Sequence, residues 1–328
     1  MDELTDWRID RLVKGMKGLK GVRLSVVGAM GIVSLSVTLA AQSYVPHRVF
    51  NTATGTFGDF ESMAAALAKA DVVFVGEQHD DPNTHRLELA ILESLARRGR
   101  RAVVSLEMFE RDVQEPLEHF LMGHTDEAEF LKSSRPWPRY ATDYKPLVDF
   151  AVSRQWPVVA ANVPRPIASE VAKGGLDVLK SKSESDRRLF AADLKCPAEG
   201  EYFRRFGDAM GSHPAADASG DEARRTLERY YASQCVKDET MAESIAQTFA
   251  AGRTAAPAPV IVHYNGAFHS DYRLGTAERI VRRLPNAKVI VISVKPVADL
   301  DDITVTKDEE KIGDFLLYTL RQKAEGKF

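Results

Sequence analysis

The sequence has few cysteines and no excess of basic charge. Of its 328 residues 2 are Cys, and 44 Lys and Arg are balanced by 47 Asp and Glu, which gives a formal net charge of -3. No basic stretch is interleaved with aromatic residues, as would be needed to neutralise phosphates and to stack on bases. This shortage argues against DNA or RNA as a partner.

The two cysteines, Cys196 and Cys235, leave two alternatives open. In an exported protein they would form a disulfide that closes a loop of about 40 residues and stabilises the fold by roughly 4 kcal/mol. Otherwise they are buried free thiols, since spacing alone does not show that two Cα atoms approach within roughly 7 Å. Neither cysteine lies near the end of the N-terminal apolar segment, so the sequence argues against a lipoprotein.

The N-terminal 41 residues have the layout of an export signal. Six Lys and Arg residues between Arg8 and Arg23 precede Leu24–Ala41, an 18-residue stretch without charge. A cleaved signal peptide has this arrangement, and the stretch also reaches the lower length limit of a membrane-spanning helix. We therefore expect residues 1–41 to be a cleaved signal or a retained anchor, the latter with membrane association through residues 24–41. Either way the rest of the chain would be exported, to the periplasm or cell envelope.

The composition, 44% hydrophobic and 28% charged, is typical of a globular protein with a large core. Short apolar runs, most of them rich in β-branched residues, indicate five buried strands of a parallel sheet. They lie at 71–75, 102–106, 157–161, 260–263 and 287–292. Helical periodicity between them predicts flanking helices. The expected fold class is α/β, with a mainly parallel sheet, flanking helices and a helical insertion subdomain.

We place the α/β domain at residues 42–300 and the helical insertion at 176–255, where no convincing strand pattern occurs. The domain begins with a short hairpin at 46–57. A tail follows at 301–328. Within it, the apolar residues of 308–328 predict an amphipathic helix packed on the domain surface.

Candidate site residues stand just after four of the expected strands. They are Glu77 and His79, Glu107, Asn162 with Arg165, and His269. Because parallel strands bring their carboxyl ends to one edge of a sheet, we expect Glu77, His79, Glu107, Asn162 and His269 to converge in one pocket. The side chains of His79 and His269 should then approach within about 8 Å. Asn162, Arg165 and His85, which lies in the first turn of the next helix, are candidates for substrate binding.

Two imidazoles and two carboxylates from separate strands allow two chemistries. His79, His269 and Glu107 match the ligands of a divalent cation such as Zn²⁺, Mn²⁺ or Fe²⁺, with a position left open for water. Without a metal, Glu77, His79, Glu107 and His269 are candidates for catalytic acid and base groups. A purely structural alternative is that these polar groups satisfy one another at the sheet edge.

Several segments resemble the ChaN-like haem-binding uptake proteins of the Tiki/EreA superfamily. They occur in the family's order between roughly residues 50 and 295: Val75-Gly76-Glu77-Gln78-His79-Asp80, Leu106-Glu107-Met108-Phe109, Tyr144-Lys145-Pro146-Leu147, Ala161-Asn162-Val163-Pro164-Arg165, Asp238-Glu239-Thr240-Met241-Ala242 and Gly266-Ala267-Phe268-His269. Together these segments are specific.

The resemblance implies an α/β fold with a helical subdomain. It also implies haem binding linked to iron uptake, in homodimers that hold haem between subunits through tyrosine and histidine. In related branches the paired Gly-x-x-His motifs and a glutamate serve metal-dependent peptidases or esterases, and this hydrolase function is the alternative. That tyrosine lies in no segment matched here, so the haem ligand stays unassigned. The chain has no Cys-x-x-Cys-His, which excludes covalent haem attachment.

Overall fold

The computed structural model describes residues 44–211, 220–254 and 257–322. These residues belong to one compact unit, Tyr44–Phe328. The expected export signal at 1–41 lies outside the described residues, so its cleavage or retention stays a prediction. Among the helices of the described ranges, none is both long and apolar enough to cross a membrane.

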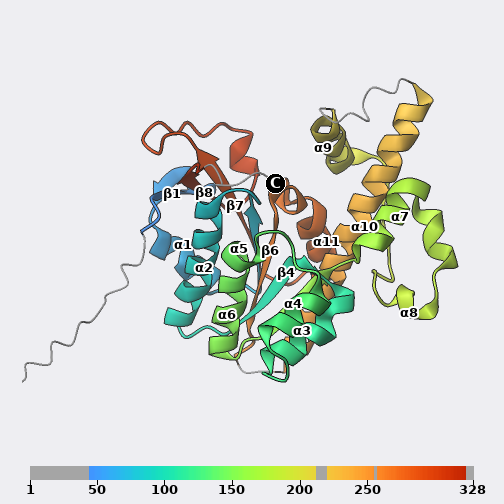
Figure 1. Cartoon of the computed structure of the whole chain (residues 1–328). Coiled ribbons are helices and arrows are strands. Elements are labelled where there is room, and N and C mark those ends of the chain that lie inside the picture. Colours follow the sequence, from blue (N-terminus) through green and yellow to red (C-terminus); the bar gives the residue numbers. More distant parts are fainter. Residues whose placement is uncertain (1–43, 212–219, 255–256, 323–328) are drawn as a thin grey trace, which may run out of the picture. The chain divides into compact units, whose positions relative to one another are not determined.

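An eight-stranded sheet organises the described residues (Figure 1). Its strands are β1 His47–Asn51, β2 Thr56–Gly58, β3 Val72–Glu77, β4 Ala102–Glu110, β5 Val158–Asn162, β6 Val260–Gly266, β7 Val289–Val297 and β8 Phe315–Leu320. The order across the sheet is β2-β1-β8-β7-β3-β6-β4-β5. The six strands from β8 to β5 are parallel, and β1 and β2 are antiparallel additions at one edge. The predicted α/β class with a mainly parallel sheet is confirmed, as are the five strands and the hairpin.

Helices cover both faces of the sheet (Figure 1). Their bounds are α1 Phe60–Leu67, α2 Pro82–Arg97, α3 Gln114–Leu121, α4 Glu127–Ser134, α5 Tyr140–Asp143, α6 Lys145–Arg154, α7 Arg165–Gly174, α8 Glu184–Arg187, α9 Gly200–Met210, α10 Asp221–Gly252 and α11 Gly275–Arg283. Val73 and Val75 of β3 pack with α1, α2 and α6 on one face. Val72 and Phe74 pack with α10 and α11 on the other. Burial on both faces explains why this strand is apolar at successive positions.

The local sequence sets both ends of α2, the helix that follows the first candidate segment. Asp81 is its N-cap residue and accepts a hydrogen bond from the backbone N–H of Thr84, with Pro82 in the first turn. Beyond the other end, Gly99 has a φ of +68°, the left-handed conformation that glycine favours. Between these ends, α2 places His85 and Glu88 one turn apart on its buried side.

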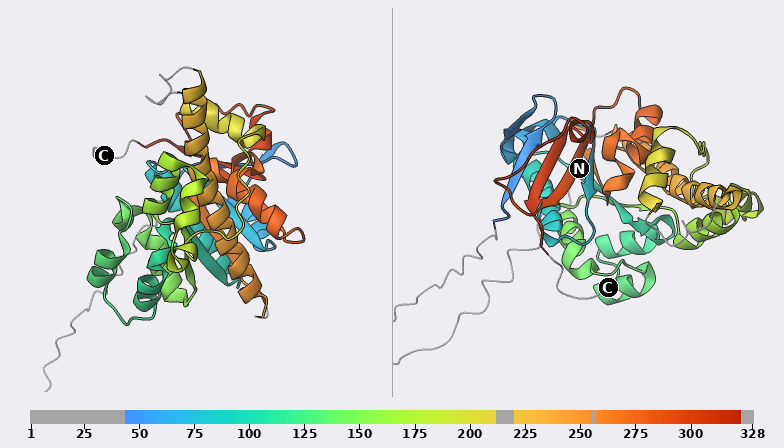
Figure 2. Two further views of the ribbon diagram at one scale, coloured as in Figure 1. Left: turned by 90° about the vertical axis from the view of Figure 1, so that its right-hand side faces the viewer. Right: turned by 90° about the horizontal axis from the view of Figure 1, so that it is seen from above.

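The predicted helical insertion at 176–255 contains helices and no strand in its described residues. Its longest helix, α10, lies beside α7 and α9 in both views of Figure 2 and also packs against α11. Ala242 and Ile245 of α10 are part of the core on that face of the sheet. This helix is therefore packed against the sheet of the α/β unit.

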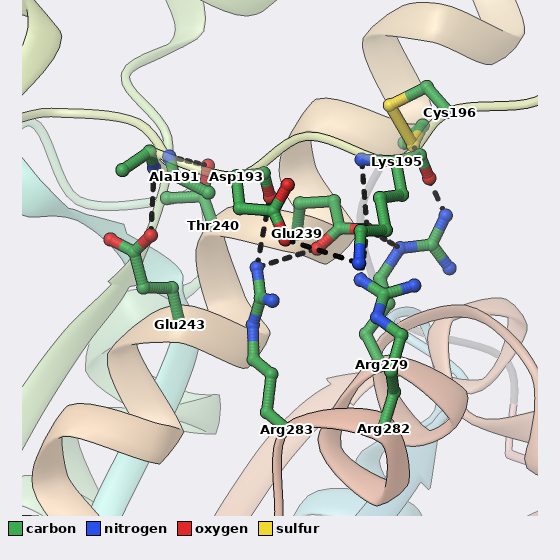
Figure 3. A network of polar contacts seen from close by, with 12 residues as sticks. Ala191, Asp193, Lys195, Cys196, Glu239, Thr240, Glu243, Arg279, Arg282 and Arg283 are labelled. Carbon is green, nitrogen blue, oxygen red and sulfur yellow. Dashed lines mark hydrogen bonds and ion pairs between the residues drawn. A yellow bond between two sulfur atoms is a disulfide. The ribbon is translucent and has the colours of Figure 1, made fainter.

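A disulfide joins Cys196 to Cys235 of α10, with the two Cα atoms 5.6 Å apart. The disulfide alternative is therefore confirmed and the free-thiol alternative is wrong. Close to the disulfide, the buried carboxylate of Glu239 forms ion pairs with three guanidinium groups of α11 (Figure 3). These belong to Arg279, Arg282 and Arg283, at 3.2, 2.6 and 2.7 Å. The disulfide joins α10 to the segment before α9, and the ion pairs of Glu239 join α10 to α11.

The C-terminal tail differs from the prediction. The expected amphipathic helix at 308–328 is wrong: Phe315–Leu320 forms strand β8, preceded by a single 3-10 turn at Glu309–Lys311. β8 runs parallel to β7 and antiparallel to β1. The reason is that Phe315–Leu320 is an almost uninterrupted apolar run buried between two neighbouring strands, and it lacks the 3.6-residue spacing of a surface helix. The sheet thus extends beyond residue 300.

Candidate functional site

A cavity of about 520 Å³ lies at the carboxyl end of the parallel strands. Its walls come from the end of β3, from α9 and from the segment after β6. The lining residues are Glu77, Gln78, His79, Tyr202, Arg205, Asp208, Gly266, Ala267, Phe268, His269, Asp271, Tyr272 and Leu274. Of the five residues expected to converge here, Glu77, His79 and His269 line the cavity, whereas Glu107 and Asn162 do not.

Glu77 and His79 form a hydrogen-bonded pair at the end of β3. His79 donates from Nδ1 to Oε1 of Glu77 (2.5 Å), and the hydroxyl of Tyr144 donates to the same oxygen (2.8 Å). Burial opposes ionisation of Glu77, but the hydrogen bond from His79 and the nearby charges outweigh it, and the pKa of Glu77 is lowered. Burial likewise opposes protonation of His79, yet its bond to Glu77 raises the pKa of the imidazole.

The free nitrogen of His79 lies beside a glycine. A Cβ atom added to Gly266 would be 2.7 Å from Nε2 of His79 and 3.7 Å from Oε2 of Glu107. The side chain of His79 is 46% exposed, whereas that of Glu77 is fully buried. Glu77 thus orients the His79 ring from the buried side, and the exposed part of the ring borders the cavity.

A second chain of polar groups runs through His269. Its Nδ1 donates to Asp238 of α10 (2.7 Å) and its Nε2 lies 3.3 Å from Oε1 of Glu107. The backbone N–H of Gly266 donates to the other oxygen of Glu107 (2.7 Å). Although burial acts in the opposite direction, the two carboxylates raise the pKa of His269 to about 10, and the charge of His269 lowers the pKa of each carboxylate. His269 is therefore a buried cation between two anions.

The three residues expected to bind substrate do not line this cavity. Asn162 donates to the carbonyl oxygen of Glu107 (3.1 Å) and accepts from the backbone N–H of Val163 (2.8 Å), so it positions the β4 backbone. Arg165 pairs with Glu110 (2.9 Å). His85 is buried behind Glu77, where Glu88, Glu77 and Asp143 raise its pKa to about 10 against the effect of burial.

A family model described as "Haem-binding uptake, Tiki superfamily, ChaN" matches residues 63–280, about two thirds of the chain. The chain belongs to this family. Among solved structures, ChaN of Campylobacter jejuni, described as binding haem cofacially, is 17% identical and has a TM-score of 0.59. The match covers 83% of this chain and 96% of that one. The resemblance inferred from the sequence motifs is thereby confirmed.

Two further solved structures are more distant. A Bacillus cereus protein is 9% identical, with a TM-score of 0.44 and coverage of 81% of this chain and 92% of its own. A mutant of the erythromycin esterase EreC in its open conformation is 14% identical, with a TM-score of 0.43 and coverage of 77% and 78%. No curated protein sequence matches the chain.

Sequence reasoning assigned no role to several site residues of this ChaN-family chain. Asp238 holds His269 from the middle of a 32-residue helix, and Tyr144 reaches Glu77 from the junction of α5 and α6. Both were part of segments that resemble the family, which was the available signal. Tyr202 and Arg205 of α9 line the cavity but belong to no matched segment. Their placement depends on the packing of α9, which no local pattern encodes.

The predicted metal ligands do not form a compact group in this ChaN-family chain. Within the described residues, the ligand atoms of His79, His269 and Glu107 are not all within 4.8 Å of one another, whereas those of Glu77, His85 and Glu88 are. Both nitrogens of His269 already face carboxylates. A metal bound by both His269 and Glu107 would replace their present contact of 3.3 Å.

Proposed function

We propose that this chain binds haem in the cavity beside His79. The observation that carries the proposal is the state of the His79 ring, in a chain that belongs to a haem-binding uptake family. Its Nδ1 is bonded to a buried carboxylate, and its Nε2 is on the side of the cavity wall formed by Gly266. Metal-binding histidines are usually held in this way, because a carboxylate on one nitrogen fixes the tautomer and makes the other a stronger ligand.

The cavity has the volume of a small-molecule site and a partly aromatic lining. Its volume of about 520 Å³ is within the range of roughly 300–1,000 Å³ typical of small-molecule sites. Tyr202, Phe268 and Tyr272 supply aromatic surface for a flat macrocycle. Arg205, which stacks over the ring of Tyr272 and pairs with Glu201 (2.7 Å), is the cation of the lining that would meet the haem carboxylates. His79 would hold the iron, and bound haem would supply a redox-active metal centre carried without covalent attachment.

The same proposal includes the role and location of the protein. We infer that it serves iron uptake as an exported haem carrier of the periplasm or cell envelope. The layout of residues 1–41 supports export, and so does the disulfide, because disulfides persist mainly in oxidising compartments. A homodimer with haem between subunits is part of the proposal, supported by the half-exposed side chain of His79, which a haem shared with a second chain would cover.

Titration with haemin tests the haem proposal. The protein should give a saturable shift of the Soret band, and His79→Ala should weaken binding by roughly 10-fold or more and change the spectrum. His119→Ala, which removes an exposed imidazole on α3, is the matched control and should behave as the unchanged protein. Absence of a saturable shift would end the proposal. A variant H79A with unaltered spectrum would place the iron ligand elsewhere.

The metal-dependent hydrolase is the second candidate, favoured by the contact of His269 with Glu107 and Asp238 in the cavity wall. Such an arrangement resembles an acid/base relay. Haem binding ranks before hydrolysis because the family model that the chain matches describes haem-binding uptake.

A further inference from the structure

Behind His79 lies a buried polar cluster that haem binding does not explain. It comprises Glu77 at the end of β3 and His85 and Glu88 on α2, which are 1%, 4% and 0% exposed. Nδ1 of His85 is 3.0 Å from Oε2 of Glu88 and 3.9 Å from Oε2 of Glu77. Two carboxylate oxygens here, Oε2 of Glu77 and Oε1 of Glu88, are buried without a hydrogen-bond partner. Orphaned buried acceptors are costly and point to a missing partner.

We propose that this cluster binds one divalent transition-metal ion through Glu77, His85 and Glu88. Their ligand atoms all lie within 4.8 Å of one another. Ligands that bind one ion with bonds of roughly 2.0–2.2 Å are separated by roughly 3–4 Å, which matches the separations of 3.0 and 3.9 Å from His85 to the two carboxylates. One imidazole and two carboxylates are a donor set for Zn²⁺, Mn²⁺ or Fe²⁺.

The residues around the cluster have the arrangement of an outer coordination shell. Nε2 of His85 lies 3.3 Å from Oδ2 of Asp143 and 3.2 Å from the carbonyl oxygen of His79. The hydroxyl of Tyr144 donates to Oε1 of Glu77, which leaves Oε2 of Glu77 free. Carboxylate–histidine–metal chains of this kind fix the ligating nitrogen and orient the ring.

The charges of the cluster are also consistent with a divalent ion. The carboxylates of Glu77, Glu88 and Asp143 are opposed by Arg139, whose Nε is 2.8 Å from Oδ2 of Asp143. A divalent cation together with Arg139 balances three carboxylates while the histidines remain neutral, and ligation requires neutral imidazole. The alternative is a proton shared between Glu77 and Glu88, with His85 cationic and no metal.

Glu77 connects this ion to the cavity. Its Oε2 would bind the ion, and its Oε1 accepts from Nδ1 of His79. The ion site does not depend on haem, because His85 and Glu88 do not line the cavity and Glu77 would bind the ion through Oε2. Its test uses metal alone. Loss of haem binding with metal binding intact would therefore leave this inference standing.

Metal analysis of refolded protein tests the inference. Because the cluster is enclosed, the chain would be unfolded with its disulfide intact, stripped with a chelator, and refolded with Zn²⁺ or with Mn²⁺. After desalting we expect about one equivalent of bound metal, and competition with a chelating dye should show that Glu88→Gln weakens binding roughly 10-fold or more. Glu93→Gln is the matched control, since Glu93 is on the same helix but 32% exposed. It should keep wild-type affinity.

Two results would overturn the inference. Less than a tenth of an equivalent in the refolded protein with either ion would favour the shared proton, and a full equivalent in E88Q at unchanged affinity would place the ion elsewhere. If E88Q does not refold, Asp143→Asn replaces it, because Asp143 positions His85 without touching the ion. That variant should lose metal affinity several-fold, and a wild-type affinity would contradict the proposed chain of contacts.

Discussion

Replacement of Asp271 by Asn should make the folded protein more tolerant of neutral and alkaline pH. Asp271 follows β6 in the cavity wall, and its Oδ1 is buried without a hydrogen-bond partner. Burial raises the pKa of this carboxyl to about 7 from an ordinary 3.8, although Ser293, Lys295 and Arg205 act in the opposite direction. A carboxyl with a higher pKa in the folded state binds its proton more tightly there. Its contribution to stability is therefore complete below about pH 4 and is lost as the pH rises through 7.

The magnitude follows from the two pKa values. Each pH unit between them is worth about 1.4 kcal/mol, so full ionisation of Asp271 in the folded state costs about 4 kcal/mol. Between pH 5 and pH 8 the titrated part of this interval gives about 3 kcal/mol. Because the residue is partly accessible from the cavity, solvent screening reduces the expected loss to about 2 kcal/mol. Asn at this position keeps the shape of the side chain and has no proton to lose.

Urea unfolding at pH 5 and pH 8, at one ionic strength, measures the effect. The free energy of unfolding of the unchanged protein should fall relative to that of Asp271→Asn by about 2 kcal/mol between the two pH values. Asp299→Asn, at an exposed position, should follow the unchanged protein. Parallel pH profiles for D271N and the unchanged protein would refute the reasoning, because they would mean that Asp271 is ionised in the folded state at pH 5.

Two further predictions concern stability on the α10 side of the fold. Glu239→Gln should lower the free energy of unfolding in urea by roughly 3–5 kcal/mol, since it leaves Arg279, Arg282 and Arg283 without their buried counter-charge. Glu243→Gln is the control, because the carboxylate of Glu243 is 19% exposed. A loss no larger than that of the control would contradict the prediction. Replacing both Cys196 and Cys235 by Ser should lower the free energy of unfolding by about 4 kcal/mol, because the loop between them is no longer closed in the unfolded chain. An unchanged urea midpoint would show that the disulfide does not constrain the unfolded chain.

The sheet was predictable where burial on both faces left a simple pattern. Runs such as Val72–Val75 are apolar at every position because helices cover both faces of the sheet, and such a run in the sequence predicts a buried strand. The same logic was available for Phe315–Leu320, but its place in the C-terminal tail favoured a surface helix. What the sequence did not contain was the partner: β8 is a strand because β7 and β1 flank it, and those pairings join segments far apart in the chain.

The site was predictable to the extent that strand ends determine it. Glu77, His79 and His269 share a cavity wall because each follows a parallel strand, which is a consequence of topology. Asn162 also stands at a strand end but does not line the cavity, because its side-chain amide donates to the backbone carbonyl of Glu107. Asp238 lies on a helix that covers one face of the sheet, and its contact with His269 depends on how α10 packs. No periodicity or spacing in the sequence predicts such a tertiary contact.

The two Gly-x-x-His segments are explained by how they pack against each other. β3 and β6 are neighbouring parallel strands, with Glu77 opposite Gly266. A Cβ atom at Gly76 would be 3.0 Å from the Cα of Ala267 and 3.0 Å from Oγ of Ser270, so the first glycine makes room for the turn of the second segment. A Cβ atom at Gly266 would be 2.7 Å from Nε2 of His79, so the second glycine makes room for the histidine of the first. Because neither glycine has a positive φ, close approach is the reason that a side chain at either position would force its neighbours to shift. The paired spacing thus reflects the close packing of two adjacent strands, in which Gly266 leaves the space that the ring of His79 occupies.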